Sequence, residues 1–93
     1  MRTIERTTRF KRDYKRESRG RHRPYLDAIL GSTVRALAND RPLEPRYHDH
    51  ALSGEWVDHR ECHLKPDLLL IYRKRGTETI SLVRLGSHHQ LGL

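Results

Sequence analysis

Cysteine and long apolar runs are the scarcest features of this 93-residue chain. Its single cysteine, Cys62, rules out a disulfide within the chain, and we expect a reducing compartment, the cytosol. The longest apolar run, Leu68–Ile71, is far too short to span a bilayer, so a membrane-spanning role is excluded. The first residues carry charge without an apolar stretch, and we therefore expect no secretory signal.

Acidic side chains are also in the minority. The chain has 19 Lys and Arg against 12 Asp and Glu, which gives a formal net charge of +7 with histidine neutral. Such an excess indicates a polyanionic partner, whether nucleic acid, an anionic membrane or an acidic protein. Hydrophobic residues make up only 34% of the chain, so the core is thin. We expect one domain over residues 1–93, built as a small sheet covered by helices.

Histidine, by contrast, is abundant and unevenly placed. There are seven histidines, and six lie in the second half: His48, His50, His59, His63, His88 and His89. Histidine has an ordinary pKa near neutrality, so it can both take and give a proton. In a basic protein this chemistry points to a phosphodiester substrate. RNA is the favoured target because it carries its own nucleophile, the 2′-OH.

The hydrophobic pattern predicts the order strand, helix, helix and then three strands. Phe10 and Tyr14 are four residues apart and form one apolar stripe on a very basic helix. This helix is expected to end at Gly20. Pro24 suits the first turn of the second helix. Short turns between the last three strands favour an antiparallel meander. The expected elements are strand Thr3–Thr8, helix Arg9–Arg19, helix Pro24–Asn39, strands Trp56–Leu64, Leu68–Arg73 and Thr79–Leu85, and one helical turn in Ser87–Leu93.

We therefore expect an α+β fold. It has an antiparallel sheet of about four strands, with the two N-terminal helices packed on one face. An irregular segment rich in proline and polar residues separates the second helix from the meander, and several of the histidines lie in it. Trp56 is expected to be a core residue.

Four segments of the second half coincide in order and spacing with a known pattern. They are Tyr47–Trp56 (YHDHALSGEW), Arg60–His63 (RECH), Pro66–Tyr72 (PDLLLIY) and Arg84–His88 (RLGSH). In this arrangement the chain resembles the YafQ branch of the RelE/ParE superfamily of bacterial toxins. The first half matches only in its two-helix layout. The family pattern carries an aromatic residue four positions after the last histidine, where this chain has Gly92.

The resemblance implies a RelE-like fold and a toxin of a type II toxin–antitoxin pair. Such toxins enter the ribosomal A site and cleave mRNA there without a metal. The implied partners are the ribosome, mRNA, a cognate antitoxin and, only through the antitoxin complex, operator DNA. No cofactor is expected. The family's functional histidines fall on His50, His63 and His88, and its acidic residue falls on Asp67.

Several basic residues are expected to bind the RNA backbone. Arg84 occupies the position of a basic residue near the family's site, and a guanidinium can hold two phosphate oxygens. Lys11, Lys15 and Arg16 belong to a cluster of positively charged residues on the first helix. These charges repel one another, so contact with RNA phosphates explains the cluster better than a solvated helix face does.

Three of the predicted catalytic residues also have a structural alternative. His63 could belong to a polar strand face that it shares with Glu61 and His59, and Asp67 could be a simple turn residue. His50 could be an exposed loop histidine.

In the predicted mechanism the 2′-OH attacks the adjacent phosphate and the 5′-oxygen leaves. His50 or His63, assisted by Asp67, takes the proton, and His88 returns one to the leaving oxygen. Arg84 stabilises the phosphate charge.

Three alternatives to this function remain open at this stage. A metal site could form from His48, His50, His59, His63 and Asp67, although three histidines from separate segments also build a metal-free nuclease, which we expect. A ParE-like toxin would inhibit a protein such as DNA gyrase without catalysis. A plain RNA-binding module would bind RNA and leave it intact.

Overall fold

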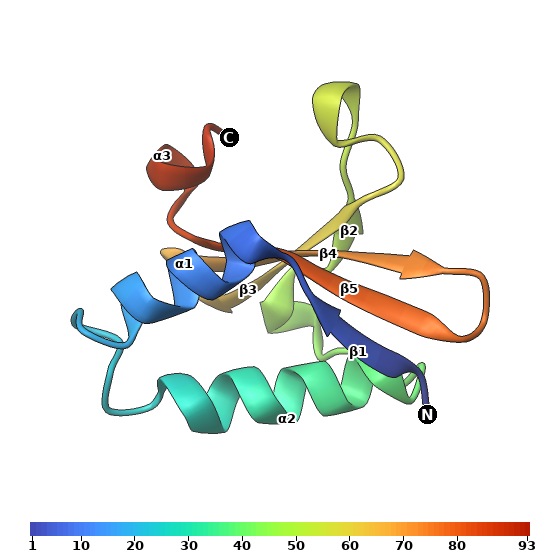
Figure 1. The fold of residues 1–93 in the computed structure, drawn as a ribbon, viewed down its shortest axis with the longest axis horizontal. Coiled ribbons are helices and arrows are strands. Elements are labelled where there is room, and N and C mark those ends of the chain that lie inside the picture. Colours follow the sequence, from blue (N-terminus) through green and yellow to red (C-terminus); the bar gives the residue numbers. More distant parts are fainter.

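Five strands form one mixed sheet in the computed structural model, which describes residues 1–93 (Figure 1). The sheet order is β1-β5-β4-β3-β2. The last three strands in sequence, β3, β4 and β5, form the predicted antiparallel meander. The strands are β1 (Thr3–Arg6), β2 (His50–Ala51), β3 (Arg60–Lys65), β4 (Leu68–Arg75) and β5 (Thr79–Gly86).

The predicted α+β class is confirmed, and the structure refines the sheet in two ways. The sheet was expected to be antiparallel, but strand β1 runs parallel to β5; the two strands lie far apart in sequence, so no hairpin turn constrains them to be antiparallel. A fifth strand, β2, adds two residues to the edge at β3. The strand predicted from Trp56 begins instead at Arg60, since Gly54–Trp56 forms a short 3₁₀ turn.

Three helices accompany the sheet: α1 (Thr8–Glu17), α2 (Leu26–Ala38) and α3 (His88–Leu91). The Thr7 side chain accepts a hydrogen bond from the Phe10 N–H and so caps the start of α1. None of the helices is both long and apolar enough to cross a membrane.

The two long helices share one face of the sheet, as predicted. Their apolar side chains and those of the sheet form the larger core, whose members include Phe10, Leu26, Leu30, Leu37, Cys62, Leu70, Tyr72, Ile80 and Leu82. The other face is covered only by α3 and the irregular segment, where Leu69, Ile71 and Leu91 form a small cluster with half-buried Trp56. In Figure 1, α2 lies below the sheet, whereas α3 and the loop that contains Gly54–Trp56 lie above it. This thinly covered face has room for a site.

A buried ion pair joins α1 to the end of β5. Arg84 Nε donates to Asp13 Oδ2 at 2.7 Å, and the Leu85 N–H donates to the same oxygen at 3.0 Å. Arg16 completes the junction by donating to the Leu85 carbonyl at 2.7 Å. Burial acts to raise the pKa of Asp13, but the bonds from Arg84 and Leu85 outweigh it and hold this pKa below its ordinary value.

We predict that Asp13→Asn lowers the free energy of unfolding by about 3 kcal/mol at pH 7, because it leaves the Arg84 charge buried without its partner. Urea denaturation followed by circular dichroism measures this change. The contribution of Asp13 is present above the ordinary aspartate pKa of about 3.9 and is lost as the pH falls through the lower pKa of the folded state. The difference between wild type and variant should therefore shrink in acid.

Asp40→Asn is the matched control. Asp40 pairs with Arg2 and Lys74, yet its side chain is half exposed, so this variant should lose much less stability than Asp13→Asn. Equal losses in the two variants would show that the buried Asp13–Arg84 pair contributes no more to stability than the exposed pairs of Asp40.

Candidate active site

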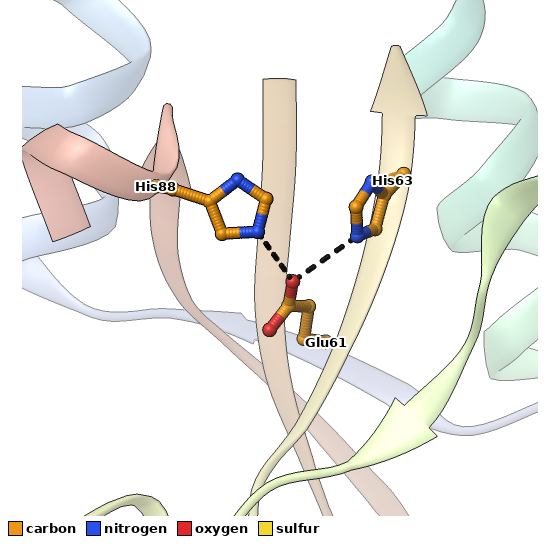
Figure 2. Close-up of side chains that lie close together, drawn as sticks. All are labelled: Glu61, His63 and His88. Carbon is orange, nitrogen blue, oxygen red and sulfur yellow. Dashed lines mark ion pairs between the residues drawn. The ribbon is translucent and has the colours of Figure 1, made fainter. Parts of the chain in front are cut away.

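A single buried carboxylate, that of Glu61, lies at the centre of the thinly covered face (Figure 2). Residues alternate in direction along β3, so Cys62 and Leu64 enter the larger core while Glu61 and His63 point to the opposite face. Only 4% of the Glu61 side chain is exposed. Three imidazole groups approach its two oxygens, and we call these residues the Glu61 cluster: Glu61, His50, His63 and His88.

Two of the histidines approach the same carboxylate oxygen. His63 Nε2 lies 3.2 Å and His88 Nε2 lies 3.4 Å from Glu61 Oε1. The two rings meet edge to face, with centroids 5.4 Å apart. Figure 2 shows both rings turned toward the carboxylate from opposite sides.

The position of His88 follows from the cap of α3. The Ser87 hydroxyl accepts from the Gln90 N–H, and the Gln90 side chain accepts from the Ser87 N–H, which is a complete capping box. Gly86, with φ of 158°, allows this close approach, since a Cβ there would lie 2.8 Å from Gln90 Oε1 and 2.6 Å from Arg16 Nη2. His88 is therefore the first residue of a helix whose start is fixed against β5.

His50 reaches the cluster from the edge strand β2, where it pairs with Glu61 in the register. Its Nε2 lies 3.7 Å from Glu61 Oε2, and its Nδ1 lies 2.6 Å from the His48 carbonyl oxygen. Because a carbonyl can only accept, Nδ1 must carry the proton of this hydrogen bond. The neutral His50 ring therefore keeps a free lone pair on Nε2, the atom that faces the cluster.

Burial controls the protonation of His63. It lowers the pKa of His63 below its ordinary value, and this effect outweighs the attraction of Glu61, which raises the pKa. The neighbouring His88 and His48 also lower it. His63 is therefore neutral near pH 7 and stays able to take a proton.

The structure brings together the three histidines of the predicted site but not the predicted acid. Asp67 lies in the β3–β4 turn, where it pairs with Arg21 and lies 3.5 Å from His22 Nε2. The carboxylate that contacts the histidines is Glu61, which the sequence prediction placed on the His63 strand face without giving it a role. The signal that could have found it is the alternation of Glu61 with His63 on one strand.

The predicted phosphate ligands lie elsewhere. Arg84 is buried against Asp13, so the prediction that it binds phosphate does not fit its position. Arg16 belongs to the same junction, because it pairs with Asp13 and donates to the Leu85 carbonyl. Lys11 and Lys15 line a groove between α1 and α2, on the helix-covered side of the molecule.

Other basic residues lie close to the histidines. A groove of about 520 Å³ begins at the Glu61 cluster and continues beside β3. It contains two cationic side chains, Arg46 and Lys65, and the half-buried ring of Tyr47. Its lining residues are Arg46, Tyr47, His48, His50, His63, Leu64, Lys65 and Pro66. His48 was predicted to lie at the surface, and it is exposed, but its ring also lies 5.3 Å from that of His63.

The Glu61 cluster has the donor atoms that a transition metal prefers. Glu61, His63 and His88 each offer one ligand atom, and these atoms all lie within 4.8 Å of one another. Two imidazoles and one carboxylate are a common ligand set for zinc. The residues therefore fit a divalent ion, and the absence of a metal from the reaction remains a prediction.

Comparisons with known proteins agree on one family. Residues 2–92 match the family described as "Bacterial toxin of type II toxin-antitoxin system, YafQ". The mRNA interferase toxin YafQ of Escherichia coli K12 is 33% identical, with 98% of this chain and 96% of that protein aligned. A metal-bound toxin from Helicobacter pylori is 45% identical, with TM-score 0.81 and coverage of 98% and 99%. YafQ in the E. coli DinJ–YafQ complex is 29% identical, with TM-score 0.79 and coverage of 98% of each chain.

We predict that Glu61→Gln lowers the pKa of His63 further, because the variant removes the negative charge that favours protonated His63. A pH titration of the histidine Cε1–H resonances by NMR measures this change. Glu55→Gln is the control, since Glu55 is exposed in the 3₁₀ turn and forms no ion pair with His63. An unchanged or higher His63 pKa in Glu61→Gln would contradict the proposed electrostatics of the cluster.

Proposed function

Because this chain belongs to the YafQ family of bacterial toxins of type II toxin–antitoxin systems, we propose that it is an endoribonuclease that cleaves mRNA in the ribosomal A site. The observation that carries the proposal is the convergence of His50, His63 and His88 on the buried Glu61 carboxylate. Imidazoles from three segments, placed beside a basic groove, are suited to proton transfer on a phosphodiester. A protein that only blocks a target has no need of them.

The proposed reaction uses the nucleophile of the RNA itself. His50 Nε2 takes the proton of the 2′-OH, and the 2′-oxygen forms a bond to the adjacent phosphorus. The bond from phosphorus to the 5′-oxygen breaks, and His88 gives a proton to that oxygen. The products are a 2′,3′-cyclic phosphate and a 5′-OH. Positioned acids and bases typically contribute about 10²–10⁴-fold each, so positioning of the RNA must supply much of the remainder.

Glu61 takes the part that was expected of Asp67. When His50 accepts a proton its ring becomes positive, and the Glu61 carboxylate 3.7 Å away stabilises that charge. The carboxylate also orients His63 and His88 through its other oxygen. Neutral His63 could replace His50 as the base, which leaves two candidates for one role.

The RNA would occupy the groove beside β3. Arg46 and Lys65 can hold backbone phosphates, and Tyr47 offers an aromatic ring near a base. The family's C-terminal aromatic residue is replaced here by Gly92, so Tyr47 is our candidate for a stacking contact. The ribosome would hold the mRNA in the extended form that this open groove can accept.

An antitoxin is the expected protein partner. The related YafQ of E. coli is found in a complex with DinJ, and a chain of net charge +7 favours a partner with acidic residues. We propose that such a partner prevents entry into the ribosome and that the complex, rather than the toxin alone, binds operator DNA.

The proposal predicts defined ends on the cleaved RNA. A reporter mRNA in a translating extract should yield 5′-OH and 2′,3′-cyclic phosphate ends. His50→Ala and His88→Ala should each slow cleavage by about 10²–10⁴-fold while circular dichroism shows an intact fold. His89→Ala is the control, because His89 is an exposed neighbour of His88 on α3 that makes no contact with Glu61.

Other outcomes identify the alternatives. Intact mRNA together with arrested DNA replication would support a ParE-like inhibitor of gyrase. A stable RNA complex without cleavage would support a plain RNA-binding module. Activity that survives the loss of both His50 and His88 would contradict the proposed catalytic residues.

Metal should inhibit rather than support this reaction. A Zn²⁺ ion held by Glu61, His63 and His88 would occupy a nitrogen of His88, the proposed acid, and a nitrogen of His63, the alternative base. We therefore predict that zinc binds the wild type in a titration calorimeter and slows cleavage, and that a zinc-selective chelator restores the rate. Glu61→Gln should weaken the binding. Loss of activity when a stoichiometric metal is removed from the purified protein would overturn the metal-free mechanism.

A further inference from the structure

A second polar network lies behind the Glu61 cluster, at the segment that carries His50. Asp49 Oδ1 accepts hydrogen bonds from the Tyr72 hydroxyl at 2.5 Å and from Arg60 Nε at 3.3 Å. Arg60 Nε also lies 3.3 Å from the Tyr72 hydroxyl oxygen. Arg60 belongs to β3, the neighbour of β2, and Tyr72 belongs to β4, the next strand of the sheet, so Asp49 is tied to both strands.

The His50 segment needs such an attachment. Strand β2 has only two residues and pairs only with β3, which gives it few backbone hydrogen bonds. His48 adopts the left-handed conformation, with φ of 47° and ψ of 43°, which is unfavourable for a residue with a side chain. This conformation persists only where neighbouring contacts impose it.

The geometry of His48 matters directly for His50. The His48 carbonyl oxygen accepts the Nδ1–H of His50 at 2.6 Å, and this bond leaves the Nε2 lone pair directed at the cluster. Asp49 lies between these two residues in the chain. Contacts that fix Asp49 therefore also fix the carbonyl that selects the His50 tautomer.

The donors to Asp49 are suited to a constant structural bond. Tyr72 is almost fully buried, and burial together with the bond to Asp49 raises the pKa of its hydroxyl. Burial acts to lower the pKa of Arg60, but the contacts with Tyr72 and Asp49 outweigh it, so its pKa is also raised. Both groups therefore keep their protons over the physiological pH range and donate to Asp49 throughout it.

We propose that Asp49, held by Tyr72 and Arg60, is a positioning residue that sets the orientation and tautomer of His50. None of these three side chains lies within the Glu61 cluster, so the effect that we propose for them reaches the reaction through His50. The inference rests on the proposed function for its kinetic consequence, but the orientation of His50 can be tested without it.

Tyr72→Phe is the sharpest test, because it keeps the buried ring and removes only the hydroxyl. In wild type, ¹⁵N NMR of the neutral histidines should show His50 protonated on Nδ1. In Tyr72→Phe we expect a mixture of the Nδ1–H and Nε2–H forms and a cleavage rate lower by about 10- to 100-fold. Asp49→Ala, in a half-exposed loop position, should give the same two effects and serves as the second variant if Tyr72→Phe does not fold.

Tyr14→Phe is the matched control, since it removes a hydroxyl bonded to Asp27 between α1 and α2, on the helix-covered side. It should leave both the His50 tautomer and the cleavage rate unchanged. The double variant His50→Ala/Tyr72→Phe should be no slower than His50→Ala, because Tyr72 acts through His50.

Two results would overturn the inference. One is an unchanged His50 tautomer in both Tyr72→Phe and Asp49→Ala. The other is a full additional loss of activity when Tyr72→Phe is combined with His50→Ala. A wild-type protein that does not cleave RNA would refute the proposed function alone, since the NMR comparison still decides whether Asp49 orients His50.

Discussion

The burial of one negative charge, on Glu61, organises the functional face of the molecule. A carboxylate that is almost fully removed from water is costly unless donors replace its hydration. Here three separate segments each place an imidazole beside the carboxylate: His63 and His88 approach one of its oxygens, and His50 lies beside the other. The two long helices cover the opposite face of the sheet, so the loops on this side are free to gather around Glu61. The proposed reactivity and the local structure therefore depend on the same charge.

The parts of this arrangement that the sequence could predict are those with local signals. Apolar spacing and turn residues predict two helices followed by a meander, and the structure has them. The resemblance to the YafQ family predicts that His50, His63 and His88 belong to one site, and all three lie beside the Glu61 carboxylate. The alternation of residues on β3 also separates Cys62, which enters the larger core, from His63.

The parts that could not be predicted depend on contacts between distant residues. Glu61 in isolation resembles a residue of a solvated strand face, and its burial requires α3 and the β2 segment. Arg84 resembles an exposed phosphate ligand until Asp13, 71 residues away, is known to pair with it. The direction of β1 relative to β5 could not be predicted either, because no hairpin turn determines it. Burial and pairing are properties of the assembled sheet, and no single segment contains them.

The brevity of α3 separates the thermal stability of the activity from that of the fold. This helix has four residues and is held by its capping box and by Leu91, whereas the sheet is held by the larger core. Short elements with few buried contacts open locally at a lower free energy than the whole domain unfolds. Warming should therefore detach His88 from Glu61 while the strands remain paired. The protein would then lose its activity reversibly, and at a lower temperature than the one at which it melts.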